Sequence, residues 1–187
     1  MPEKLAIEQV NDLNIEEFVA KFGSLYEHSP WVADEAWRKR PFHSFSELHG
    51  AFQAAVREAP QERQLDLIRA HPDLAGRAAV TGELTPESTR EQVSAGLDRL
   101  SPEEYETLNR LNNAYKEKFG FPLIFAVKEH TKQTILSGAE TRLEHSRSKE
   151  IEIALAEIAK IADLRLQDLV ELDYAEGRQS QGREGRV

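Results

Sequence analysis

Hydrophobic residues recur at intervals of three and four along most of the chain, the spacing that places side chains on one face of an α-helix. One such segment follows Asn14 and presents Ile15, Phe18, Val19, Phe22 and Leu25. Another follows Ser44 and presents Leu48, Ala51, Phe52, Ala55 and Val56. Polar residues occupy the positions between them, so the pattern predicts amphipathic helices that bury these faces against one another.

Residues that begin or end helices divide the chain into segments of helical length. The start signals, whose side chains suit the first turn of a helix, are Asn14, Ser29-Pro30, Ser44, Thr85-Pro86, Ser101-Pro102, Thr131 and Ser148. Glu47 lies three residues after Ser44 and completes the sequence of a capping box. We expect His71-Pro72 to end a helix over residues 61–70, and Gly120 to end the helix after Ser101.

The exception to this pattern is FPLIFAV, residues 121–127, a continuous apolar run. Its periodicity is compatible with a buried strand or with a buried helical or extended connection. No second run of comparable strength is available to pair with it, which favours an unpaired extended segment or a helix start over a sheet. We therefore predict an all-α, bundle-like fold of about seven to nine helices in a single domain.

The length of 187 residues suits one domain with one core. From residue 174 the sequence becomes rich in Gly, Gln and Arg with few apolar residues, so we predict a helical domain over residues 1–173 and a flexible tail over residues 174–187. No apolar run is long enough to cross a bilayer, and the first residues lack an apolar signal core. We expect a cytoplasmic protein that does not bind membranes.

The formal net charge is −9, and basic residues are interspersed with acidic ones, which disfavours nucleic acid as a partner. An anionic substrate would then need a few cationic groups inside its pocket. The chain has no cysteine, no HExxH or HxH spacing, and none of the GxGxxG, GxxxxGK[ST] or GxSxG motifs. We therefore expect no metal and no cofactor, and chemistry that depends on side chains alone.

Arg165 lies among the apolar positions of the last predicted helix, over about residues 149–172. The inward side of this helix carries Ile151, Ala154, Leu155, Ile158, Ile161, Ala162, Leu169 and Val170. A buried cation without a partner is very costly, so Arg165 requires an anion, either a carboxylate of the protein or a ligand. Periodicity alone is equally compatible with a snorkelling or structurally paired arginine.

Two further features are candidates for chemistry. Ser88, Glu91, Gln92 and Ala95 share one helix face, which can line a pocket or be an ordinary solvated face. His71 lies at a helix end before a proline, which would hold its imidazole in place. A histidine can exchange a proton near neutral pH, although a lone histidine is more often structural. The residues alone indicate a helical domain with a histidine, a carboxylate and an inward arginine.

Four blocks of sequence together resemble one known family. They are HPDLAG, ES-REQ-SAGL, LN-AY-KFGFPLIFAVK and EIAKIADLRLQDL, in this order and with seventeen residues from His71 to Ser88. The chain resembles the OHCU decarboxylases from about residue 14 to residue 172. The resemblance implies an all-α homodimer that converts 2-oxo-4-hydroxy-4-carboxy-5-ureidoimidazoline (OHCU) to (S)-allantoin and CO2 in urate degradation, without a cofactor.

The resemblance also assigns roles to residues. His71 would be the proton donor. From the chemistry of the reaction, we expect Glu91 to be its orienting or relaying partner and Arg165 to be an electrostatic clamp on a substrate oxygen. Substrate contacts are expected from Pro72, which would pack on the ring, and from Ser88, Glu91 and Gln92. Backbone contacts to the ureido and ring groups are expected from Leu123, Ile124, Phe125, Ala126 and Val127. Two alternatives remain: a helical lyase or isomerase that acts on another ureido compound, and a non-catalytic scaffold whose polar face binds an acidic partner.

Overall fold

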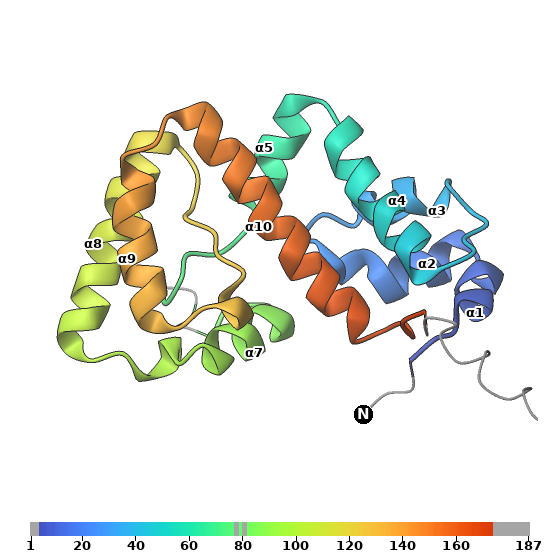
Figure 1. Cartoon of the computed structure of the whole chain (residues 1–187), viewed down its shortest axis with the longest axis horizontal. Coiled ribbons are helices and arrows are strands. Elements are labelled where there is room, and N and C mark those ends of the chain that lie inside the picture. The colour runs from blue at the N-terminus through green and yellow to red at the C-terminus, as the bar shows by residue number, and fades with distance from the viewer. Residues whose placement is uncertain (1–3, 77–78, 80–81, 174–187) are drawn as a thin grey trace, which may run out of the picture.

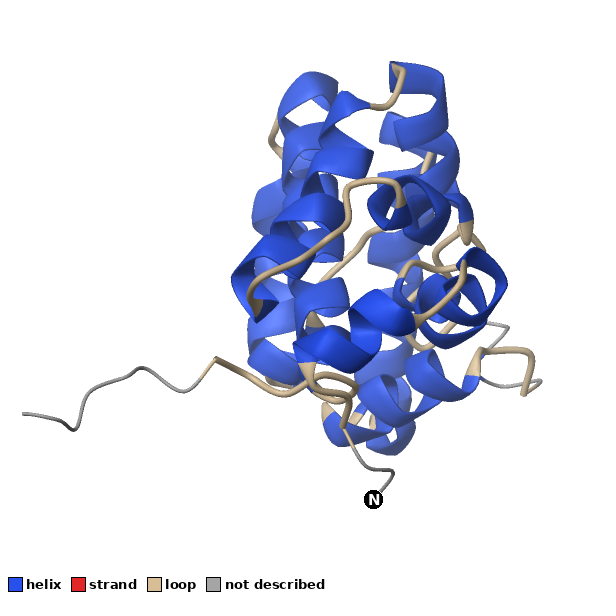
Figure 2. Cartoon of the chain, turned by 90° about the vertical axis from the view of Figure 1, so that its right-hand side faces the viewer, coloured by secondary structure: helices blue, strands red, loops and turns tan. Residues whose placement is uncertain are grey.

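The computed structural model describes residues 4–76, 79 and 82–173, and these residues form helices and connections with no strand (Figure 2). The α-helices are α1 (Ile7–Asp12), α2 (Ile15–Phe22), α3 (Trp31–Trp37), α4 (Phe45–Glu58), α5 (Gln61–Arg69), α7 (Pro86–Ser94), α8 (Pro102–Phe119), α9 (Lys132–Leu143) and α10 (Arg147–Gln167). Short 3-10 turns are η1 (Gly23–Leu25), η2 (Leu97–Arg99) and η3 (Val127–Glu129). The predicted all-α fold is confirmed, whereas the predicted tail, residues 174–187, lies outside the described residues.

Helix α10 crosses the middle of the molecule, with α1–α4 on one side and α7, α8 and α9 on the other (Figure 1). It contacts α4, α5, α8 and η1. The inward side of α10 is apolar as predicted, with Ala154, Ile158 and Ala162 buried, and Arg165 is also buried at 6% exposure. Both halves of the fold therefore pack against one helix.

Most of the predicted helix starts are confirmed as N-caps. Side chains accept a hydrogen bond from the backbone N–H three residues later at Asn14, Ser44, Thr85, Ser101 and Thr131. Glu47 does not complete a capping box, because its carboxylate accepts from the His43 N–H (2.8 Å) instead. At the other end of α8, Gly120 adopts the left-handed conformation (φ 80°) that ends the helix, as predicted.

The predicted bounds of the last helix are wrong at both ends. Its N-cap is Ser146 rather than Ser148, because the Ser146 hydroxyl reaches the Lys149 N–H (3.3 Å) and leaves Arg147 already helical. The helix ends at Gln167 because the following segment pairs with the chain's beginning. Leu5 donates its N–H to the Leu169 carbonyl (2.9 Å) and accepts from the N–H of residue 171 (2.9 Å).

The segment FPLIFAV forms no strand. Residues 122–126 make an irregular connection between α8 and η3, and all of them are buried. The interpretation of this run as an unpaired buried segment is confirmed. Among the described residues, no helix combines the length and the apolar character needed to span a membrane.

Asp173 closes the fold by capping a helix far away in the sequence. Its carboxylate accepts from the N–H groups of Phe45 (2.8 Å) and Ser46 (3.4 Å), the first two of α4. Those N–H groups have no acceptor within the helix, and the N-terminal end of a helix favours a negative charge.

Replacing Asp173 with alanine removes this distant cap. We expect the free energy of unfolding to fall by about 1 kcal/mol, measured by urea denaturation at neutral pH. Glu171→Ala is the control, because residue 171 is exposed and pairs through its backbone. Equal midpoints for the wild type and Asp173→Ala would show that the cap does not stabilise α4.

Candidate active site

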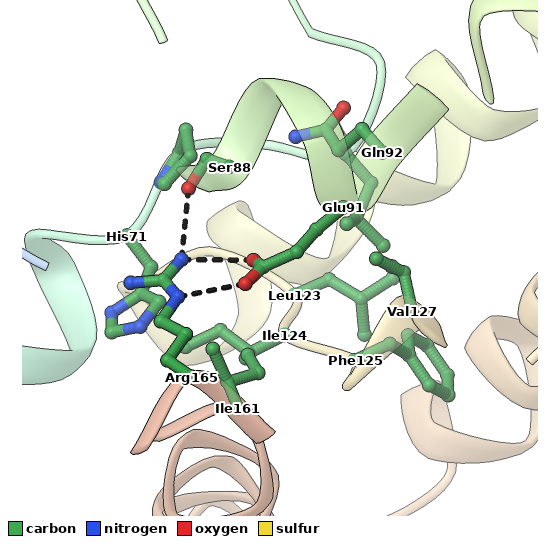
Figure 3. A pocket seen from close by; sticks show the side chains of 12 residues that line it. His71, Ser88, Glu91, Gln92, Leu123, Ile124, Phe125, Val127, Ile161 and Arg165 are labelled. Carbon is green, nitrogen blue, oxygen red and sulfur yellow. Dashed lines mark hydrogen bonds and ion pairs between the residues drawn. The ribbon is translucent and has the colours of Figure 1, made fainter. Parts of the chain in front are cut away.

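One cavity brings together nearly all of the predicted site residues (Figure 3). Its empty volume is about 350 Å³, including space open to solvent. Its lining comes from the loop after α5, from α7, from the connection before η3 and from α10, and consists of His71, Pro72, Leu74, Ser88, Glu91, Gln92, Leu123, Ile124, Phe125, Val127, Ile161 and Arg165. Segments distant in the sequence thus converge on one space, as predicted.

His71 is held as a neutral imidazole with one nitrogen free. Its Nδ1 lies 3.0 Å from the Leu67 carbonyl oxygen at the end of α5. A carbonyl only accepts, so Nδ1 carries the proton and Nε2 is the unprotonated nitrogen. Burial lowers the pKa of His71 to about 4, with the nearby Arg165 acting in the same direction and Glu27 opposing it. At neutral pH, Nε2 is therefore unprotonated, with its lone pair free.

The anionic partner that Arg165 requires is supplied by the protein. Its Nε and Nη2 donate to the two carboxylate oxygens of Glu91 at 2.7 Å and 2.8 Å, as Figure 3 shows. Its Nη1 donates to Glu27 (3.2 Å) and to the backbone carbonyls of Ser24 (3.1 Å) and Leu25 (3.3 Å). All three nitrogens of the guanidinium are engaged, and Glu91 is oriented by Arg165.

Glu27 belongs to this network but was not among the sequence candidates. It is 2% exposed and accepts from the hydroxyls of Thr85 (2.7 Å) and Ser88 (3.1 Å) as well as from Arg165. Burial alone would raise the pKa of Glu27, but the Thr85 hydrogen bond and the Arg165 charge outweigh it and lower the pKa. The signal in the sequence was indirect: a buried arginine needs carboxylates, but the chain has 33 acidic residues.

Gln92 holds the loop that carries His71. Its Oε1 accepts from the Ala75 N–H (2.9 Å) and its Nε2 donates to the Asp73 carbonyl (3.4 Å). Asn112 of α8 donates to the carbonyl of the residue between them, Leu74 (2.9 Å). The loop is therefore fixed from two helices, which fixes the imidazole at its start.

The predicted wall residues do not all face the cavity. Leu123, Ile124, Phe125 and Val127 line it, but Ala126 does not, and its N–H donates to Glu157 at 2.7 Å. Leu74 and Ile161 line the cavity although they were not predicted. Within the described parts of the chain, no group of three or more His, Asp or Glu residues could hold a metal ion.

The guanidinium at the cavity is neutralised by carboxylates of the protein. With both carboxylates ionised, Arg165, Glu91 and Glu27 together carry one net negative charge, and His71 is neutral. Much of the remaining lining is apolar, with Leu123 and Ile161 among its residues. The arrangement can move a proton at His71 and present hydrogen-bonding groups, with no excess of positive charge among the residues that line the cavity.

Together, the fold and the cavity define an all-α protein with a buried acid–base site. The family model described as OHCU decarboxylase matches residues 11–167. The chain therefore belongs to the OHCU decarboxylase family.

Relatives with this name match nearly the whole chain. The chain is 49% identical over 166 residues to the 2-oxo-4-hydroxy-4-carboxy-5-ureidoimidazoline decarboxylase of Halalkalicoccus jeotgali, which covers 89% of this chain and 92% of the relative. It is 49% identical over 163 residues to the decarboxylase of the same name from Haloferax volcanii, and the match covers 87% of this chain and 95% of that relative. A crystal structure of (S)-allantoin synthase has a TM-score of 0.69 and 29% identity, and the match covers 89% of this chain and 55% of that one.

The depressed pKa of His71 predicts a dependence of stability on pH. The folded pKa of about 4 lies below the ordinary value of 6.5, so the unfolded chain binds more protons between these values. The free energy of unfolding should therefore fall, by up to about 3 kcal/mol, as the pH drops from 6.5 to 4.

His71→Asn should flatten this slope in urea denaturation, whereas replacing the exposed His43 should not. Nitrogen NMR of the histidine side chains should show His71 protonated on Nδ1 alone at pH 6. If His71 titrates near pH 6.5, burial does not lower its pKa.

Proposed function

We propose that the protein decarboxylates OHCU to (S)-allantoin in urate degradation, with His71 as the residue that moves the proton. The observation that carries this proposal is a buried imidazole with a free Nε2 in the same cavity as Ser88 and Glu91. Family membership supports the choice of substrate.

The substrate itself provides the electron sink. Breaking the bond from C4 to the carboxylate releases CO2, and the electron pair moves into the adjacent C5=N imine, which forms a C4=C5 double bond. The 4-hydroxyl then loses its proton as C4 becomes a carbonyl, and C5 gains one. The ring nitrogen also takes up a proton, so that the anion consumes one proton overall and gives neutral allantoin and CO2.

His71 is suited to move the proton between C4 and C5. A neutral imidazole cannot donate from Nε2, so it must first accept a proton, for which the 4-hydroxyl of the substrate is the source we propose. Its low pKa makes the resulting imidazolium a strong acid that protonates C5 readily. Donation from the one fixed position of His71 would set the S configuration, and the imidazole returns to its original state.

The charges around the cavity would favour loss of the carboxylate. The substrate carboxylate would lie near the group formed by Arg165, Glu91 and Glu27, whose net charge is negative, and near an apolar wall. These surroundings would destabilise the carboxylate relative to neutral CO2. We therefore assign Arg165 a positioning role instead of the expected clamp on a substrate oxygen, because its nitrogens already bind protein acceptors and orient Glu91. Glu91 and Ser88 would hydrogen-bond the ureido and ring groups, and Pro72 would pack on the ring.

We also propose that the protein is a homodimer, as the resemblance implies, and that it is cytoplasmic. Two large hydrophobic side chains are exposed on α7 and α8, Val93 (45%) and Tyr105 (40%). Tyr105 borders a hollow lined also by Leu97, Leu100 and Pro102. Exposed apolar surface of this kind is typical of subunit interfaces. Sedimentation equilibrium, which gives the mass of the assembly in solution, tests whether the protein is a homodimer.

The central test replaces His71 with asparagine. We expect normal folding and a loss of activity of about 10² to 10⁴-fold, the usual contribution of proton transfer. The assay uses freshly generated OHCU and follows CO2 release and the optical purity of allantoin against the uncatalysed racemate. Turnover near that of the wild type would remove His71 from the mechanism.

Glu27→Gln tests whether the charge of Glu27 destabilises the bound carboxylate. The glutamine oxygen can still accept from Thr85 and Ser88, but one negative charge near the substrate carboxylate is gone. KM and kcat should therefore both decrease several-fold, the signature of relieved ground-state destabilisation. Glu62→Gln, an exposed site with the same change of net charge, is the control. An increase in KM for Glu27→Gln would show that the Glu27 charge does not destabilise the bound carboxylate.

A further inference from the structure

The cavity wall at Phe125 is held from behind by two charged side chains that do not line the cavity. Arg142 of α9 donates from Nη1 to the Ile124 carbonyl. Glu157 of α10 accepts from the Ala126 N–H at 2.7 Å. Both side chains are buried, with exposures of 5% for Arg142 and 8% for Glu157. The peptide groups before and after Phe125 are each fixed by one of them.

Peptide geometry then determines how the backbone of Phe125 is oriented. The bonds here are trans, because the cis peptide of the described chain lies at Arg40-Pro41. In a planar trans peptide, the C=O of one residue and the N–H of the next point in opposite directions. The Phe125 N–H therefore points away from Arg142, and the Phe125 carbonyl points away from Glu157. Neither group has a hydrogen-bond partner among the described residues.

The ring of Phe125 is fixed as firmly as its backbone. Arg142 lies 4.9 Å from the ring centroid, and His130 packs against the ring edge-on at 5.1 Å between centroids. Helix α9 approaches the ring through Gly138, where an added Cβ would lie 3.0 Å from the ring. A side chain at position 138 would therefore push Phe125 toward the cavity.

Arg142 is itself locked by a buried cluster. Its Nε donates to Glu150 at 2.8 Å, and Glu150 is completely buried. The same carboxylate accepts from the Tyr115 hydroxyl and lies 2.6 Å from Nδ1 of His145. This support leaves the guanidinium little freedom to release the Ile124 carbonyl. The cluster thus connects the cavity wall to α8, α9 and α10.

The family resemblance implies backbone contacts from residues 123–127 to the ureido and ring groups. We propose that Arg142 and Glu157 are positioning residues for this recognition, which orient the N–H and C=O of Phe125 as a donor–acceptor pair for a urea-like edge. Such an edge offers one C=O and one N–H side by side, as the ring and ureido group of OHCU do. The pair at Phe125 complements it with two hydrogen bonds and selects against substrates that lack one of the two groups. This inference rests on the proposed function.

The first test is Gly138→Ala, which shifts Phe125 without altering any polar group. We expect KM for OHCU and Kd for (S)-allantoin to rise about ten-fold through weakened hydrogen bonds, with kcat within about two-fold. The melting temperature should not fall enough to explain this, because alanine favours a helix over glycine. Gly50→Ala in α4 is the matched control, since an added Cβ there meets nothing within 4 Å.

The second test compares Arg142→Lys with Tyr115→Phe. Lysine keeps the charge beside Glu150 but lacks the planar fork that reaches both Glu150 and Ile124. Phenylalanine at position 115 disturbs the same buried carboxylate but leaves the Ile124 contact in place. We expect a rise in KM of about ten-fold only for Arg142→Lys, because the Ile124 carbonyl then loses its donor.

The outcomes separate the two proposals. A wild-type protein that fails to accelerate OHCU decay would overturn the proposed function and this inference with it. An active wild type with unchanged KM and Kd in Gly138→Ala would overturn the inference alone. Equal rises in KM for Arg142→Lys and Tyr115→Phe would also overturn it, because the effect would then follow the integrity of the cluster. If Arg142→Lys does not fold, the comparison of Gly138→Ala with its control Gly50→Ala tests the inference.

Discussion

The need to neutralise one buried guanidinium organises this molecule. Arg165 lies on the inward side of α10, where an unpaired cation would cost more free energy than the fold can spare. Glu91 and Glu27 provide the compensation, from positions 74 and 138 residues away in the sequence. The network joins α10 to α7 and to the segment after η1, and it does so at the edge of the cavity. Stability and the site depend on the same contacts.

The chemistry of the cavity follows from this compensation. An arginine shared between two carboxylates attracts an anion weakly, so the site differs from a simple cationic pocket for an acidic substrate. The neutral His71 fits the same environment, because a buried imidazole with its Nδ1 committed to a carbonyl keeps Nε2 free for a proton. Proton transfer and removal of a negative charge are what a decarboxylation requires, and the surroundings favour both.

Local features of the fold could be predicted from the sequence, and distant ones could not. Helices and most caps depend on residues within one turn, and the inward Arg165 followed from helical periodicity. The resemblance brought His71, Ser88 and Glu91 together, and the cavity contains them. The end of α10 depends on pairing with Leu5, and the partner Glu27 depends on the tertiary fold. Periodicity within a segment carries no information about either contact.

Helix α7 packs against the rest of the fold through polar side chains. Ser88 meets Glu27, Glu91 meets Arg165, and Gln92 meets the backbone at Ala75. A slip of one residue along the helix would rotate all of these groups by about 100° and break every contact at once. The helix can therefore seat in a single register. The site is therefore preorganised. Because its dipoles are aligned before a ligand binds, the reaction requires little reorganisation energy.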